Sequence, residues 1–103
     1  MFAAVVNGEE PHRLPTGVSL DPVAPSHVAG SLPLGAALSP EGDRVVLLLC
    51  GWREQGVQVM DRSTGEITQF LPQAAAFAGI VFSPDGKTLW ASGGNDDSVY
   101  RYA

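Results

Sequence analysis

The chain has 103 residues, which is enough for a single hydrophobic core and too few for two domains. Its 11 acidic residues against 6 basic ones give a net charge of -5, which excludes the broad cationic surface that nucleic-acid binding requires. The single cysteine, Cys50, excludes an internal disulfide and a thiolate metal cluster, and no apolar run approaches the roughly 20 residues that cross a bilayer.

The beginning of the chain differs in pattern from the rest. Residues 1–13 show no hydrophobic period, so we expect them to form a loose leader. Their short opening apolar run has no Lys or Arg before it and lacks the features of a secretory signal. From residue 14 onward, short apolar stretches recur about every 8 to 12 residues, the spacing of consecutive antiparallel strands. A first strand segment is therefore predicted within residues 14–32.

Two stretches 44 positions apart read almost the same, SPEG at residues 39–42 and SPDG at residues 83–86. In each, proline presets φ at about -65° for the second turn position, and glycine can take the left-handed conformation that closes a hairpin. Residues 61–65, DRSTG, predict another hairpin, because Asp61 can accept from the turn amides and Gly65 can relieve the backbone. Each turn is expected to separate two strands.

The turns divide the chain into one set of four short strands and a second set of three. The stretch 73–78 is rich in alanine but too short to hold a helix. Corresponding strands are 42 to 44 residues apart, which is the period of a β-propeller blade. We predict strands over residues 34–38, 44–50, 56–60 and 66–71 in the first set, and over 78–82, 88–92 and 98–102 in the second.

The predicted fold is all-β, an incomplete β-propeller of about one and a half to two four-stranded antiparallel blades. The repeat units span residues 33–72 and 77–103. Residues 45–50, VVLLLC, are apolar on both faces, which favours a strand covered from both sides, as blades around an axis cover one another. Cys50 is expected to pack there as a small apolar residue.

These phrases resemble the YVTN type of seven-bladed β-propeller repeat. The resemblance rests on LSPEG at 38–42, GVQVMDRSTG at 56–65 and VFSPDGKTLW at 81–90. More narrowly, LPTGVSLDP at 14–22 with GSLPL at 30–34 resembles the opening of bacterial propellers that carry a phosphoesterase-like domain further along. The resemblance covers residues 14–103, and it implies a binding scaffold and a periplasmic or extracellular location.

Several features depart from that family. Glu41 stands where the family commonly has Asp, and Trp90-Ala91-Ser92 stands where the YVTN signature would begin. Relatives close a ring of about seven units, whereas this chain supplies one full unit and most of another. Propeller active sites are generally built from loops of several blades, so the resemblance implies the scaffold and not the activity.

No set of residues in the sequence points to catalysis. His12 and His27 lie outside the repeated units, without an acidic or cysteine neighbour at ligand spacing, and are expected to be solvated loop residues. Ser39 and Ser83 stand beside proline in turns, where a hydroxyl bonds to the turn rather than serving as a nucleophile. The sequence therefore predicts no catalytic residue, no metal and no cofactor in this chain.

Two loops at corresponding places in the repeats carry the candidate ligand-binding residues. In the loop GGNDD, Asn95 and Asp96 offer oxygens to a hard cation, but the spacing of a calcium loop is missing and a turn with unusual backbone angles is favoured. In the loop GWREQG, Trp52 and Arg53 are of the type that anchors binding surfaces. Trp52 could instead cover the edge of its own blade.

Two functions follow from these observations. The first is a non-catalytic propeller segment that acts as a scaffold for binding a ligand or protein. The alternative is a fragment of a propeller-containing hydrolase, lactonase-like or phosphoesterase-linked, whose catalytic residues lie outside this chain. Under either, an uncovered blade face forgoes on the order of 10 kcal/mol of apolar burial. We therefore expect self-association through open blade faces and strand edges, or partial disorder, with residues 1–13 mobile.

Overall fold

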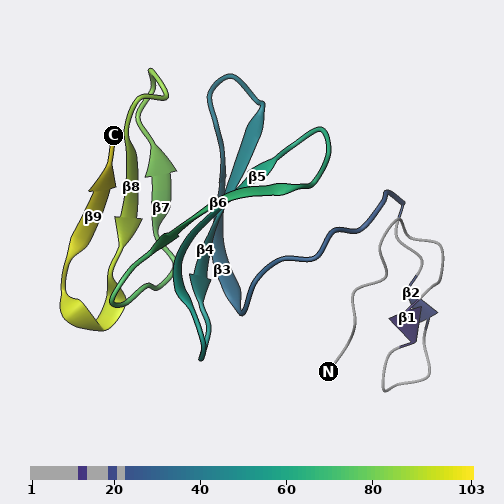
Figure 1. The fold of residues 1–103 in the computed structure, drawn as a ribbon, viewed down its shortest axis with the longest axis horizontal. Helices are drawn as coiled ribbons and strands as arrows, with labels where there is room; N and C mark the ends of the chain where they lie inside the picture. Colours follow the sequence, from purple (N-terminus) through teal and green to yellow (C-terminus); the bar gives the residue numbers. More distant parts are fainter. Residues whose placement is uncertain (1–11, 14–18, 21–22) are drawn as a thin grey trace.

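The computed structural model describes residues 12–13, 19–20 and 23–103 of the chain (Figure 1). These residues form three open antiparallel sheets of two, four and three strands and contain no α-helix, so the predicted all-β class is confirmed. The strands are β1 (His12–Arg13), β2 (Ser19–Leu20), β3 (Pro33–Leu38), β4 (Arg44–Cys50), β5 (Gln55–Asp61), β6 (Ile67–Pro72), β7 (Ile80–Phe82), β8 (Leu89–Ser92) and β9 (Val99–Tyr102), with a 3₁₀ turn, η2 (Gly94–Asp96), between the last two.

The strands of the two larger sheets lie where the turn chemistry predicts them. Each begins and ends within two residues of its expected bounds, and the alanine-rich stretch 73–78 forms no helix. In both sheets the strands are neighbours in chain order, β3-β4-β5-β6 and β7-β8-β9. The second sheet thus matches the first three strands of the first sheet and has no strand equivalent to β6.

The first part of the chain is described only in fragments. β1 pairs with β2, so one strand falls at the end of the expected leader and the other within the predicted segment 14–32. Residues 23–32 contain no strand, so that prediction is met only at β2. Residues 1–11, 14–18 and 21–22 lie outside the described residues, and with them the expected mobility of the leader.

The corner between β3 and β4 is held by the hydroxyl of Ser39, which is buried. It donates to Asp43 Oδ1 at 2.8 Å and accepts the Arg44 N–H at 3.0 Å. The Gly42 N–H donates to the Ser39 carbonyl at 2.8 Å, and Gly42 has a φ of 77°, which glycine adopts without strain. One side chain therefore satisfies the backbone and fixes the register of the hairpin.

The corner between β7 and β8 repeats this arrangement around Ser83. Its hydroxyl donates to Asp85 Oδ1 at 2.6 Å and accepts the Thr88 N–H at 3.0 Å. The Gly86 N–H donates to the Ser83 carbonyl at 2.9 Å, and the φ of Gly86 is 73°. The two SPxG corners therefore share one backbone conformation and one role for the serine.

The corners differ in which carboxylate they use. Asp85, the third residue of its corner, bonds to the serine, whereas Glu41 at the equivalent position lies 4.0 Å from Arg44 and leaves the serine to Asp43. The two corners lie side by side, because a Cβ at Gly86 would be 3.4 Å from Pro40. The acceptor of the serine hydroxyl thus differs between the two corners, whereas the turn conformation is the same.

The turn between β5 and β6 is organised by the carboxylate of Asp61. Its Oδ1 accepts the Ser63 N–H at 2.8 Å, the Ser63 hydroxyl at 2.6 Å and the Thr64 N–H at 3.1 Å. Gly65 has a φ of 72° and donates its N–H to the Asp61 carbonyl at 2.8 Å. Both features are those predicted from DRSTG.

The two larger sheets stack face to face, and the core lies between them (Figure 1). Pairing of Val46 with Val59 and of Leu48 with Val57 places these side chains on one face of the first sheet. The first strands of the sheets also touch, since a Cβ at Gly35 on β3 would lie 3.2 Å from Ile80 Cγ2 on β7. The core comprises Val46, Leu48, Val57, Val59, Ala76, Leu89 and Ala91, with Ala37, Leu71, Ile80, Phe82 and Tyr102 packed around it.

The crossover, residues 73–79, leads from the outermost strand of the first sheet to the first strand of the second. Gln73 is buried in it and bonds the second sheet, with Nε2 donating to Ser92 O at 3.2 Å and Oε1 accepting the Tyr102 hydroxyl at 2.9 Å. From the first sheet, Gln55 Oε1 accepts the Ala76 N–H at 2.7 Å. The crossover therefore ties both sheets together through the side-chain amides of Gln73 and Gln55.

Cys50 also lies under the crossover. It is half-buried, and its Sγ donates to the Ala76 carbonyl at 2.9 Å. The thiol therefore packs against the crossover as well as contacting a polar atom, which apolar periodicity alone does not show.

The other face of the first sheet is crossed by a strap, residues 27–31. The Gly30 N–H donates to Gln58 Oε1 at 3.1 Å and the Ser31 N–H to Glu54 Oε1 at 3.2 Å. His27 is exposed but its ring lies against Gly65, where a Cβ would collide with it. The expectation that β4 is covered on both faces is thus met in part, by the second sheet on one side and by the strap on the other.

We expect Ser39→Ala and Ser83→Ala to lower the free energy of unfolding by similar amounts, about 1 kcal/mol each, because each removes the same acceptor of a backbone N–H. Urea denaturation followed by circular dichroism measures both. Ser26→Ala, outside both corners, is the control and should change stability by less than about 0.5 kcal/mol. A large cost for one corner and none for the other would contradict their equivalence.

Gln73→Ala should destabilise the chain by about 2 to 3 kcal/mol, because it leaves the Tyr102 hydroxyl and the Ser92 carbonyl without their partner. In the double variant with Tyr102→Phe, the cost should be smaller than the sum of the two single costs. Gln69→Ala, an exposed glutamine on β6, is the matched control. If the two destabilisations measured by thermal or urea unfolding are additive, the hydrogen bond between Gln73 and Tyr102 does not contribute to stability.

Candidate functional site

The β4–β5 loop, residues 51–54, projects from one end of the first sheet. Between the equivalent pairs Leu48–Val57 and Ser92–Val99, the first sheet contains two more residues than the second, and β4 and β5 use them to extend their pairing. The loop is closed by the Gly51 N–H, which donates to Glu54 O at 3.1 Å. The first copy thus carries its loop on a longer hairpin than the second.

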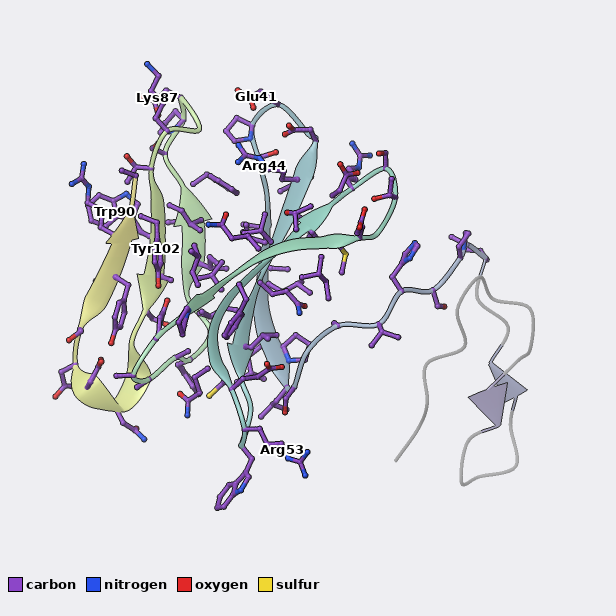
Figure 2. The ribbon with its side chains drawn as sticks, viewed as in Figure 1. Glu41, Arg44, Arg53, Lys87, Trp90 and Tyr102 are labelled. Carbon is purple, nitrogen blue, oxygen red and sulfur yellow. The ribbon has the colours of Figure 1, made fainter. Side chains whose placement is uncertain are left out.

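Trp52 and Arg53 stand at the tip of this loop. The Trp52 side chain is 99% exposed, so it does not cover the edge of its own sheet. Arg53 is exposed beside it, and Figure 2 shows it at the opposite end of the sheet from Glu41. An exposed indole and guanidinium on a short closed loop can stack on and hydrogen-bond to a partner.

The β8–β9 loop is occupied by its own hydrogen bonds. Asp96 accepts the Tyr100 hydroxyl at 2.6 Å through Oδ2 and the Ser98 N–H at 3.0 Å through Oδ1. Asp97 has a φ of 55°, the left-handed conformation that Asp tolerates. The favoured interpretation of this loop as a turn with unusual backbone angles is therefore confirmed at Asp97, and Asp96 holds the turn together.

The carboxylates of the turns have perturbed acidities. The Tyr100 hydroxyl holds the pKa of Asp96 below its usual range, and the Asp96 carboxylate in turn raises the pKa of Tyr100. The Ser63 hydroxyl, with the amides of the same turn, lowers the pKa of Asp61, and the Ser83 hydroxyl lowers that of Asp85. For the three carboxylates, hydrogen bonds to the charged form stabilise it, whereas for Tyr100 the bond to Asp96 stabilises the neutral hydroxyl.

A hollow of about 580 Å³ lies beside the crossover at the same end as these loops. Of the four candidate residues, only Asn95 lines it; Trp52, Arg53 and Asp96 do not. Phe77 of the crossover also lines it and is exposed, a residue that the sequence pattern did not single out. Within the described residues, no three His, Cys, Asp or Glu side chains gather as a metal site would require.

A second groove, of about 330 Å³, opens between the two sheets at the corner end. Its lining combines apolar core side chains with the cations Arg44 and Lys87 (Figure 2). Arg44 lies 3.7 Å from Asp43, which offsets its charge. Sequence reasoning missed this groove, although the pairing of corners from successive copies was the signal that could have located it.

Comparisons of the chain with protein-family models, with curated proteins and with solved structures found no match. Among the described residues, no helix has the length and apolar character to cross a bilayer.

Stability should fall as the pH drops below about 4. The pKa values of Asp43, Asp61, Asp85 and Asp96 are lowered from 3.8 in the folded chain, so the unfolded chain binds protons first and is favoured as acid is added. Above that pH the contribution is fully present. Urea denaturation from neutral to acidic pH measures this dependence.

Asp85→Asn should flatten that acid dependence, because one of the perturbed carboxylates is removed. Glu66→Gln, whose carboxylate takes no part in the turn bonds described above, should leave the dependence unchanged. Equal curves for the wild type and Asp85→Asn would show that the bond to Ser83 does not stabilise the ionised carboxylate.

Proposed function

We propose that this chain is a segment of a YVTN-type β-propeller, of about two blades, that acts as a non-catalytic scaffold for binding a ligand or protein. The observation that carries the proposal is the repetition of one structural unit. Both sheets have an SPxG corner with the same serine bonds, at Ser39 and Ser83, and both have their strands in chain order.

The stacking of the sheets supports blades around a common axis. The first strands, β3 and β7, are in contact, and the crossover leads from the last strand of one sheet to the first strand of the next. The loops then emerge in two layers, corners at one end and the β4–β5 and β8–β9 loops at the other (Figure 1). A propeller presents its binding loops in such layers.

The polar groups of the repeats support a scaffold role rather than catalysis. The hydroxyls of Ser39 and Ser83 are each bonded to a carboxylate and to a backbone N–H. Asp61 and Asp96 likewise bond to the turns in which they lie. These groups serve the fold, which leaves the exposed Trp52 and Arg53 as the side chains presented for recognition.

Peptides selected from a random library on the immobilised chain test the binding role. We expect selected peptides to lose about 10-fold or more in affinity for Trp52→Ala and for Arg53→Ala, since exposed aromatic and Arg anchors dominate such surfaces. Lys87→Ala, at the corner end, is the control and should bind as the wild type does. Peptides that bind Trp52→Ala unchanged would refute the assignment of the loop.

Assay of the purified chain with lactone and phosphoester substrates tests the non-catalytic part. The expected result is turnover no faster than the buffer blank. Turnover above that level, lost on substitution of a residue in this chain, would overturn the proposal in favour of a hydrolase.

A further inference from the structure

The second sheet has an exposed apolar face on the side away from the first sheet. Val81 is 57% exposed, Trp90 40% and Val99 69%. Register pairs Trp90 with Val81 on one side and with Arg101 on the other, and the guanidinium lies 5.7 Å from the Trp90 ring centroid. Figure 2 shows Trp90 projecting away from β3–β6, so within the described residues nothing covers this face.

The first sheet shows what this face is built to contact. By repeat position and by register, the row Val81–Trp90–Arg101 corresponds to the row Ala37–Val46–Val59. In the first sheet that row lies in the core, packed against the second sheet. The exposed face of the second sheet is therefore the equivalent of a face that is buried against a following sheet.

The opposite end of the stack has the complementary face. The outward row Leu38–Val45–Met60 of the first sheet corresponds in register to Phe82–Leu89–Tyr102 of the second, which packs inward on the core. Leu38 is 51% exposed, and Ile67 and Phe70 on the same sheet are exposed as well. The chain thus presents both halves of its internal sheet-to-sheet interface, one at each end.

The strap, residues 27–31, leaves that outward row accessible. It bonds to Gln58 on β5. In the second sheet the crossover bonds to β9, the strand that corresponds to β5, where Gln73 Oε1 accepts the Tyr102 hydroxyl. The strap therefore lies where the crossover lies in the internal interface. The crossover lies beside the internal interface and does not prevent the two sheets of the chain from packing. The strap has the same position on the outward face of the first sheet, so it would not prevent another sheet from packing there.

We propose that a second copy of this chain docks head to tail, with the Trp90 face of one copy packing on the Leu38 face of the next as the two sheets do within the chain. The proposal rests on the blade assignment above and names the partner of the open faces. Because the two faces differ, the contact is heterologous and adds copies in one direction until a ring closes or a filament grows. Burial of apolar side chains on both faces drives it.

Sedimentation velocity of the full chain over a wide range of concentrations tests this contact. The wild type should form species larger than a monomer as concentration rises. Trp90→Lys and Leu38→Lys each place a charge on one face, and each should weaken self-association by at least about 30-fold. Trp52→Lys removes an equally large indole from the loop tip and should associate as the wild type does. Circular dichroism confirms that the variants remain folded.

Mixing the two face variants distinguishes a head-to-tail contact from a symmetric one. Trp90→Lys keeps an intact Leu38 face and Leu38→Lys keeps an intact Trp90 face, so a mixture should form 1:1 dimers and stop there. A wild type that stays monomeric, variants that associate unchanged, or a mixture that stays monomeric would each overturn the proposal. The peptide-binding experiment tests the Trp52 loop, which is a different surface from the two sheet faces. Failure of self-association therefore leaves the binding proposal standing, and failure of peptide binding leaves the self-association proposal standing.

Discussion

The structure depends on how the serine hydroxyl closes each SPxG corner. In each hairpin the serine hydroxyl, of Ser39 or Ser83, accepts a backbone N–H at the start of the second strand and so holds it beside the end of the first strand. A glycine in the left-handed conformation completes each turn. This fixes hairpin register, and in a sheet a slip of one residue would exchange the two faces. The apolar rows on both sheets, the core between them and the exposed rows at the ends of the stack all follow from that alignment.

The strands and turns could be predicted because their causes are local. Proline, aspartate and glycine at fixed offsets determine the backbone at 39–42, 61–65 and 83–86, and the strands fill the distances between them. The role of Gln73 could not be predicted in this way. Its partners, Ser92 and Tyr102, are distant in sequence and meet it only after the sheets stack, and the strap before β3 likewise depends on contacts with Gln58 and Glu54.

The candidate site was predictable in type but not in arrangement. The exposed pair Trp52 and Arg53 lies on a loop, as expected, yet only the structure shows that the indole stands clear of its sheet. The sequence favoured a turn over a cation site at Asp96, and the structure shows the bonds of that turn, in which the carboxylate accepts from Tyr100 and Ser98. Phe77 comes beside Asn95 through the crossover, a connection that carries no local pattern.

In the longer β4–β5 hairpin, the residues that set the register and the residues that add length lie at opposite ends. Register is set at the corner end, whereas the extra residues enter at the far end, where they add strand pairs and lift Trp52 outward without moving the core. The length and chemistry of these tips therefore differ between the two copies, while the corners at the other end keep one arrangement. The length of the tips and the preservation of the fold are then governed by different stretches of the chain.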